Sequence, residues 1–203
     1  MEKTTSSSEN STSHSPRINS SNLDRTSKES ENTNSNDMSI VSPEKQHKIP
    51  RGPFYSVVCE GRIAFGRYPT QYQVNKLVHK KFEVFVDLTD FPKAFYNAPI
   101  IVRFPIKDTT IPNESMRPLL NKVARYIDNG YKIYIHCEHG RGRSALLTAM
   151  FITILYKTDY DKTISILNDA HHQGHGNNNK WQGKLIPPHT CQRDFLRGFI
   201  TGL

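Results

Sequence analysis

The chain has 203 residues, a formal net charge of +8 at pH 7 and 35% hydrophobic residues, which allows one domain of ordinary size plus a polar segment. Its cysteines, Cys59, Cys137 and Cys191, are far apart and form no CxxC pair. This spacing argues against a structural zinc site and a disulfide framework, and it favours a reducing, intracellular compartment, cytoplasmic or nuclear. We expect no secretory signal peptide and no membrane span, because the longest apolar run, ALLTAMFITILY, reads as a buried helix.

The composition changes near residue 50. Residues 1–50 are rich in Ser, Asn and Thr and have too few apolar side chains to form a core, so we predict a disordered N-terminal tail followed by one catalytic domain over 53–203. The tail holds 6 of the chain's 27 Lys and Arg and 7 of its 19 Asp and Glu, which leaves a net charge of about +9 on the rest. Such a surface favours phosphates, RNA or anionic membranes as partners, although we expect no DNA binding.

After residue 53, strand-like and helix-like patterns alternate. Apolar or β-branched runs predict strands at 54–58, 62–65, 84–88, 100–104 and 131–136. Helical spacing of apolar residues predicts helices at 70–81, 115–129, 145–156, 159–170 and 190–200, and the polar residues 171–188 are expected to form a loop. Thr70 is a predicted N-cap, and Gly130 a predicted stop. Strands interleaved with helices indicate an α/β sheet covered on both faces, with ligands bound beyond the carboxyl ends of the strands.

The segment after Cys137 carries the clearest chemistry. Its glycines join a strand to a helix N-terminus, so several backbone N–H groups can point into one anion-binding concavity. Arg143 can hold two phosphate oxygens at once. The same field stabilises a thiolate, so we expect Cys137 to attack phosphorus as a nucleophile. The expected phosphate-binding residues are Glu138, His139, Gly140, Arg141, Gly142 and Arg143.

The departing oxygen needs a proton, and Asp108 is the candidate general acid and base. It follows strand 100–104, which we expect to lie beside the strand that ends at His136. Ser144 can hydrogen-bond the sulfur, and Gln192 can orient the attacking water. Asp87 and Asp90 are rival acids, but they end a different strand and are better interpreted as turn residues.

His136-Cys137, five residues, and Arg143-Ser144 form an HCx5RS motif. On this motif the chain resembles the cysteine-dependent protein tyrosine phosphatase superfamily, most of all its compact dual-specificity branch. DTTIP, with Asp108 29 residues before Cys137, resembles that branch's acid loop, and the likeness covers roughly residues 55–200. The resemblance implies a central mixed, mostly parallel sheet flanked by helices, no metal and no cofactor. It also implies Cys137 as nucleophile, Arg143 as phosphate ligand, Asp108 as acid and Ser144 as the hydroxyl.

Three functions stay open. The first is a dual-specificity phosphatase of phosphotyrosine and phosphoserine or phosphothreonine in proteins. The second is a phosphatase of a non-protein polyanion, such as a phosphoinositide, an inositol polyphosphate or an RNA 5′ end, which Arg141 and His139 in the basic loop favour. The third is a binding module for phosphorylated ligands without turnover, against which the complete set of Cys, Arg and Asp argues.

Other candidate residues have less specific signals. We expect His136 to tune the thiolate through hydrogen bonds to the loop. His171, His172 and His175 stand in a Gly- and Asn-rich stretch without other ligands, and we expect them to be solvated and not to bind a metal. Whether Cys59 or Cys191 pairs with Cys137 under oxidation stays open.

Overall fold

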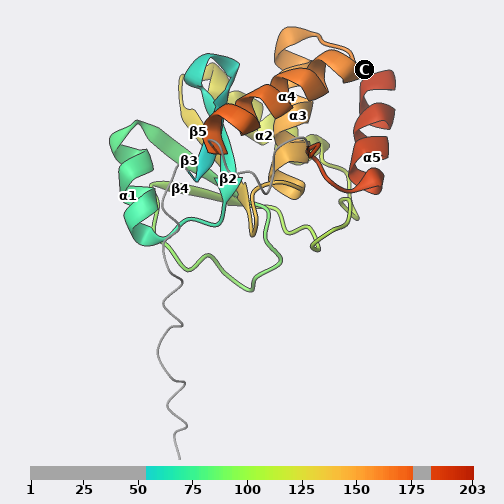
Figure 1. Ribbon diagram of the computed structural model, residues 1–203. Helices are drawn as coiled ribbons and strands as arrows, with labels where there is room; N and C mark the ends of the chain where they lie inside the picture. The colour runs from blue at the N-terminus through green and yellow to red at the C-terminus, as the bar shows by residue number, and fades with distance from the viewer. Residues whose placement is uncertain (1–53, 176–183) are drawn as a thin grey trace, which may run out of the picture. The chain divides into compact units, whose positions relative to one another are not determined.

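A computed structural model describes residues 54–175 and 184–203 (Figure 1). The predicted disorder of residues 1–50 and the predicted domain start at residue 53 lie outside these ranges, and so does part of the predicted loop 171–188.

The described residues form a five-stranded sheet in the order β1-β2-β5-β3-β4. The strands are β1 (Tyr55–Val58), β2 (Ile63–Arg67), β3 (Phe82–Asp87), β4 (Ile100–Arg103) and β5 (Lys132–Cys137). Only β1 is antiparallel to its neighbour, and the other pairs are parallel. The predicted mixed, mostly parallel sheet is therefore confirmed. One expectation is wrong: β4 does not lie beside β5, because β3 separates them.

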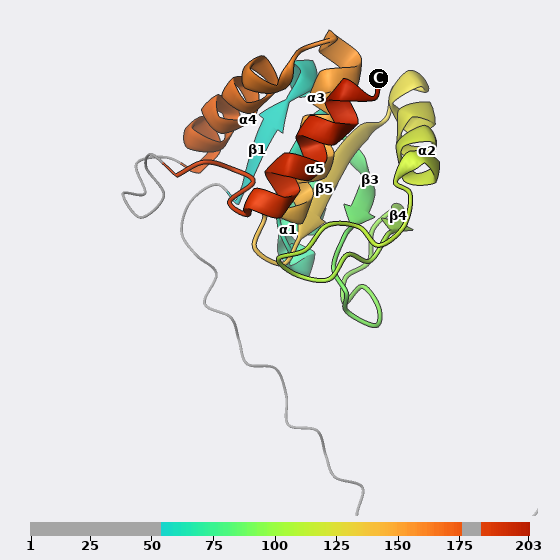
Figure 2. The same ribbon diagram turned by 90° about the vertical axis from the view of Figure 1, so that its right-hand side faces the viewer.

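Helices cover both faces of this sheet (Figure 1, Figure 2). They are α1 (Gln71–His79), α2 (Arg117–Asp128), α3 (Arg143–Tyr156), α4 (Tyr160–His175) and α5 (Thr190–Thr201). Helix α1 packs on one face with a small aromatic-rich core, and α2 to α5 cover the other face with the larger core. None of the helices within the described ranges combines the length and apolarity needed to cross a bilayer.

The alternating pattern of the strands explains the two cores. In β5, Ile133 and Ile135 face α3, while Tyr134 between them faces α1. Helix α3 lies in the larger core, and its residues from Arg143 to Thr153 are all buried, as its continuous apolar run predicts. Helix α1 begins at the predicted N-cap Thr70, whose side chain accepts from the Gln73 backbone N–H. The Gln73 side chain accepts in turn from the Thr70 backbone N–H, which completes a capping box.

Helix α4 corrects a sequence prediction, because it continues through residues 171–175, which were expected to be a loop. The polar sequence is helical there because tertiary packing overrides the local pattern. His171 is buried and stacks on Phe65 of β2, with ring centroids 6.5 Å apart. At Gly174 a Cβ atom would lie 2.5 Å from Ser56 Oγ, so glycine lets the helix approach β1 closely.

Candidate active site

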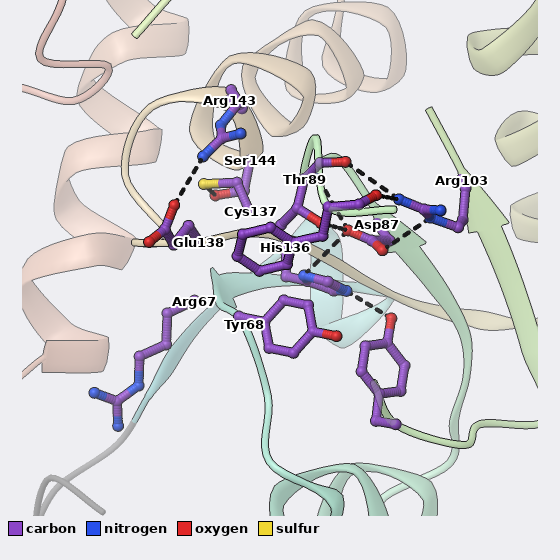
Figure 3. A network of polar contacts seen from close by, with 12 residues as sticks. Arg67, Tyr68, Asp87, Thr89, Arg103, His136, Cys137, Glu138, Arg143 and Ser144 are labelled. Atoms are coloured by element: carbon purple, nitrogen blue, oxygen red, sulfur yellow. Dashed lines mark hydrogen bonds and ion pairs between the residues drawn. The ribbon is translucent and has the colours of Figure 1, made fainter. Parts of the chain in front are cut away.

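The parallel strands bring the candidate residues to one edge of the sheet. Arg67 at the end of β2 is opposite Cys137 at the end of β5, and Asp87 at the end of β3 is opposite His136. The loop 138–142 leaves this edge and enters α3. Figure 3 shows Cys137, Ser144 and Arg143 grouped at this junction, as the sequence predicted.

The thiol of Cys137 is buried, with 2% of its surface exposed, and it is surrounded by donors. The backbone N–H of Gly140 donates to Sγ at 3.2 Å, and Ser144 Oγ lies 3.4 Å from Sγ. Both contacts stabilise negative charge on sulfur. The predicted contact between Ser144 and the sulfur is thus present.

Gly140 fixes the loop against the end of β2. Its φ of +78° is in the left-handed region, and a Cβ there would lie 2.3 Å from the Arg67 nitrogen and 2.4 Å from the Gly66 carbonyl carbon. The Tyr68 backbone N–H also donates to the Glu138 carbonyl at 3.2 Å. Glycine is therefore required for both conformation and space.

Arg143 is the first residue of α3, and only 1% of its side chain is exposed. Its Nη1 donates to the Ile106 carbonyl at 2.9 Å and to Asp90 Oδ1 at 3.2 Å. Its Nη2 lies 2.8 Å from Asp108 Oδ1 and 3.9 Å from Glu138 Oε2, but these are ion pairs and not well-directed hydrogen bonds. Nε and Nη2 are thus buried without a hydrogen-bond partner, a state that oxygens of a bound phosphate would relieve.

Asp108 reaches the site although its strand is not adjacent to β5. After β4 the chain continues in the same direction beside the end of β3, where the Phe104 N–H donates to the Asp87 carbonyl and the Ile106 N–H to the Leu88 carbonyl. This extension of the chain past the end of β3 places the half-exposed Asp108 carboxylate against Arg143. The predicted acid is therefore at the site by a different route.

Asp90 was interpreted as a turn residue, and the structure corrects this by placing its carboxylate on Arg143. Asp90 follows β3, whose carboxyl end lies at the same edge of the sheet as that of β5. It was missed because β3, not β4, is the neighbour of β5.

His136 lies behind the loop in a buried polar network (Figure 3). Burial lowers the pKa of its imidazole to about 4, so the ring is neutral at pH 7. The Tyr96 hydroxyl is 2.6 Å from Nε2, and burial raises the pKa of this phenol. Nδ1 lies 4.0 Å from Asp87 Oδ1 and has no hydrogen-bond partner. Asp87 in turn accepts from Thr89 and Arg103. The expected hydrogen bond from the His136 ring to the loop is replaced by the one to Tyr96.

Gln192 is fully buried, which its sequence did not reveal, and it lies beside the loop. Its Nε2 donates to the Thr110 carbonyl at 2.9 Å, and its carboxamide contacts Gly142. The other loop residues are more open: Glu138 and His139 are exposed, and Arg141 is half-buried, which lowers the pKa of its guanidinium.

Within residues 54–175 and 184–203, one group of side chains could share a metal ion, namely Asp108, Glu138 and His139, with ligand atoms within 4.8 Å of one another. Arg143 contacts two of these three residues, and its positive charge opposes a cation there. His171 and His172 belong to α4 and not to this group.

The other two cysteines lie in different places. Cys59 directly follows Val58 of β1, and Val58 pairs with Ile63 of β2. Ile63 pairs with Ile133 near the start of β5, whereas Cys137 is the last residue of β5. The length of the strand separates these thiols, so they cannot form a disulfide without rearrangement. Cys191 is exposed and lies beside the segment of Asp108, with Sγ 3.5 Å from the Thr109 carbonyl oxygen.

Comparison with known proteins agrees with this geometry. The model of the dual specificity phosphatase catalytic domain matches residues 63–188. The protein 197R of Invertebrate iridescent virus 6, named as a candidate tyrosine phosphatase, is 31% identical over 132 residues, which are 60% of this chain and 50% of that protein. The chain thus spans about half the length of this relative.

Solved structures show the same fold at low sequence identity. The active form of Tk-PTP is 19% identical, with a TM-score of 0.59 over 74% of this chain and 99% of that one. PTPMT1 in complex with PI(5)P is 17% identical, with a TM-score of 0.55 over 73% and 96% of the two chains. Since the family model matches more than half of the residues, the chain belongs to the dual specificity phosphatase catalytic-domain family.

Proposed function

We propose that the protein hydrolyses phosphomonoesters through a phosphocysteine intermediate. The observation that carries the proposal is the arrangement around Cys137: Gly140 N–H and Ser144 Oγ contact its sulfur, and Arg143 Nε and Nη2 are buried without a hydrogen-bond partner. Asp108 lies against the same guanidinium, so nucleophile, phosphate ligand and acid are within one site.

In the first step the Cys137 thiolate attacks phosphorus, and the bond between phosphorus and the ester oxygen breaks. The electron pair goes to the departing oxygen, which takes a proton from the Asp108 carboxyl group. Arg143 and the N–H groups of the loop stabilise the charge on the phosphoryl oxygens during this transfer.

In the second step water attacks phosphorus, and the bond between sulfur and phosphorus breaks. The Asp108 carboxylate takes a proton from this water, and Ser144 donates a hydrogen bond to the departing thiolate. Inorganic phosphate leaves, and the protein returns to its starting state.

The lead substrates are phosphorylated proteins, including phosphotyrosine. Support comes from the loop after β3, where Asp90 contacts Arg143 and the next residue, Phe91, packs on Tyr68 with ring centroids 5.4 Å apart. Phe95 on this loop is 63% exposed, and Arg103 binds the Phe91 carbonyl and fixes the backbone. Aromatic side chains on the loop that also carries the Arg143 contact Asp90 suit an aryl leaving group.

The alternative substrate is a non-protein polyanion, such as a phosphoinositide, an inositol polyphosphate or an RNA 5′ end. It is favoured by Arg141 and His139 in the loop and by the net charge of about +9 after residue 50. The fold accommodates such a ligand in PTPMT1, which was solved with PI(5)P. Contact with a membrane surface or RNA belongs to this alternative.

The test is phosphate release by the full chain and by Cys137→Ser with a chelator present. The panel contains phosphotyrosine and phosphothreonine peptides, a phosphoinositide and a triphosphorylated RNA. Release that the substitution abolishes supports the proposal, and the best substrate selects between the two classes. Tight binding of these ligands without release by the wild type would contradict it and leave a phosphate-binding module.

A further inference from the structure

The segment that carries Asp108 has an unfavourable backbone conformation. Thr109 has a φ of +63°, which is rare for a β-branched residue and is energetically unfavourable. Within the segment, Thr110 donates to the Lys107 carbonyl from Oγ1 at 2.8 Å and from its backbone N–H at 3.3 Å. Arg143 contacts the residues before Thr109, namely the Ile106 carbonyl and the Asp108 carboxylate. Other parts of the fold must therefore hold this conformation.

The first turn of α5 supplies the contacts. Gln192 Nε2 donates to the Thr110 carbonyl at 2.9 Å, two residues after Asp108. Since a carbonyl only accepts, this bond also fixes which end of the carboxamide faces the segment. Cys191 adds a weak contact, with Sγ 3.5 Å from the Thr109 carbonyl oxygen, and remains exposed.

The same carboxamide contacts the phosphate loop. At Gly142, just before Arg143, a Cβ would lie 3.1 Å from Gln192 Oε1 and 3.3 Å from Nε2. Gln192 has no exposed surface, so its side chain has little freedom. One buried group thus lies between the segment of the acid and the loop of the nucleophile.

We propose that Gln192 is a positioning residue that holds Asp108 over the phosphate loop through the Thr110 carbonyl. This inference rests on the proposed function and assigns Gln192 a role in proton donation. It differs from the role expected from the sequence, which was to orient the attacking water. Oε1 is buried without a hydrogen-bond partner and could accept from that water, so the experiment must separate the two roles.

The two roles act on different steps. A mispositioned acid slows loss of a basic leaving group, such as phenol, but not of an acidic one, such as a fluorinated umbelliferone, which needs no proton. A mispositioned water slows hydrolysis of the phosphocysteine, which is the same for every ester. The dependence on the leaving group therefore separates them.

The experiment compares wild type, Gln192→Met and Asp108→Asn on a series of aryl phosphates. Methionine keeps the volume of the side chain and removes the donor. We expect kcat/KM of Gln192→Met to fall about 10- to 100-fold on phenyl phosphate and less than about twofold on the fluorinated ester. In the Asp108→Asn background, Gln192→Met should have almost no further effect on phenyl phosphate, because it acts through the acid.

Asn168→Ala is the matched control. This buried carboxamide also holds a loop backbone, with bonds to the N–H and carbonyl of Ile186, but that loop does not carry the acid. We expect it to lower the melting temperature without changing the dependence on the leaving group. If Gln192→Met does not fold, Gln192→Asn, which cannot reach the Thr110 carbonyl, takes its place.

Two results would overturn the inference. A burst of phenol followed by slow turnover, with kcat/KM unchanged, would assign Gln192 to the water. The role of Gln192 would be structural if Gln192→Met lowered kcat/KM equally on all esters, and if Asn168→Ala, at an equal loss of stability, lowered kcat/KM by the same factor. Failure of the proposed function differs from both, because the wild type itself would then show no release that depends on Cys137.

Discussion

Cys137 and Cys59 are buried to the same degree, with 2% and 3% of their surfaces exposed, but their settings are opposite. Cys137 ends β5, faces the Gly140 N–H and Ser144, and stands at the entry to α3. Cys59 lies at the other end of the sheet, where burial raises the pKa of its thiol to about 11. Burial alone therefore makes a thiol inert, and it is the set of local donors that makes a buried sulfur suitable as a nucleophile.

The largest expected difference is in activity. Cys137→Ser should lower phosphate release at least about 10³-fold, since a serine hydroxyl is a poor nucleophile without a base. Cys59→Ser should leave kcat within about twofold, because it touches no part of the site. Steady-state assays on a phosphotyrosine peptide measure both. Comparable losses of activity in the two variants would show that Cys137 does not act as the nucleophile.

The glycines that follow these cysteines sharpen the comparison. Gly61 and Gly140 both have positive φ, but a Cβ at Gly61 has no neighbour within 4 Å, whereas one at Gly140 meets the backbone of Gly66 and Arg67. Gly61→Ala should cost about 1–2 kcal/mol, from the left-handed conformation alone. Gly140→Ala should cost about 3 kcal/mol or more, and should also lower activity. Urea unfolding measures the costs, and equal values would refute the close approach of the loop to β2.

The free energy of unfolding at acid pH tests the surroundings of His136, the residue before Cys137. The unfolded pKa of His136 is near 6.5 and its folded pKa is about 4, so the unfolded chain binds the proton first as the pH falls. Stability should therefore be lost between pH 6.5 and 4, by about 3 kcal/mol from this group. Urea unfolding across this range, compared with His136→Asn, isolates the contribution. A difference between the two proteins that does not change with pH would show that His136 is not held neutral by burial.

The free energy of unfolding at alkaline pH tests the surroundings of Cys59. The folded pKa of Cys59 is about 11 against 9.0 for the free thiol, so its proton is lost first from the unfolded chain. Stability should be fully present below pH 9 and fall by about 2 kcal/mol as the pH rises to 11. Cys59→Ala should remove this part of the fall, which unfolding measurements at several alkaline pH values can detect. An unchanged alkaline profile in the variant would mean that the thiol titrates as if solvated.

Most of the fold was predictable because its signals are local. Thr70 as a predicted N-cap marked the start of α1, and the continuous apolar run of α3 marked the central helix. The end of α4 was not predictable, because residues 171–175 are polar and are held in the helix by contacts with Phe65 and Ser56 on distant strands.

The site divides in the same way. Cys137, Arg143 and Ser144 share one strand, loop and helix, so their spacing alone predicts the phosphate loop. The position of Asp90 depends on the order of the strands, and the position of Gln192 depends on where α5 packs. Neither feature can be predicted from a local sequence pattern. Asp108 was predicted from its place in the loop after strand 100–104 and from the resemblance of DTTIP to the family's acid loop, although the expected neighbouring strand was wrong.

The burial of α3 has a consequence for how the protein loses activity on heating. Arg143 and Ser144 belong to the most buried helix, and the loop before them is bonded to β2. The hydrogen-bonded backbone N–H groups of α3 from Leu146 onward should therefore exchange with solvent only through the largest opening motions of the domain. The half-exposed segment of Asp108 belongs to a less stable layer, so gentle warming should weaken proton donation well before the capacity to bind phosphate disappears.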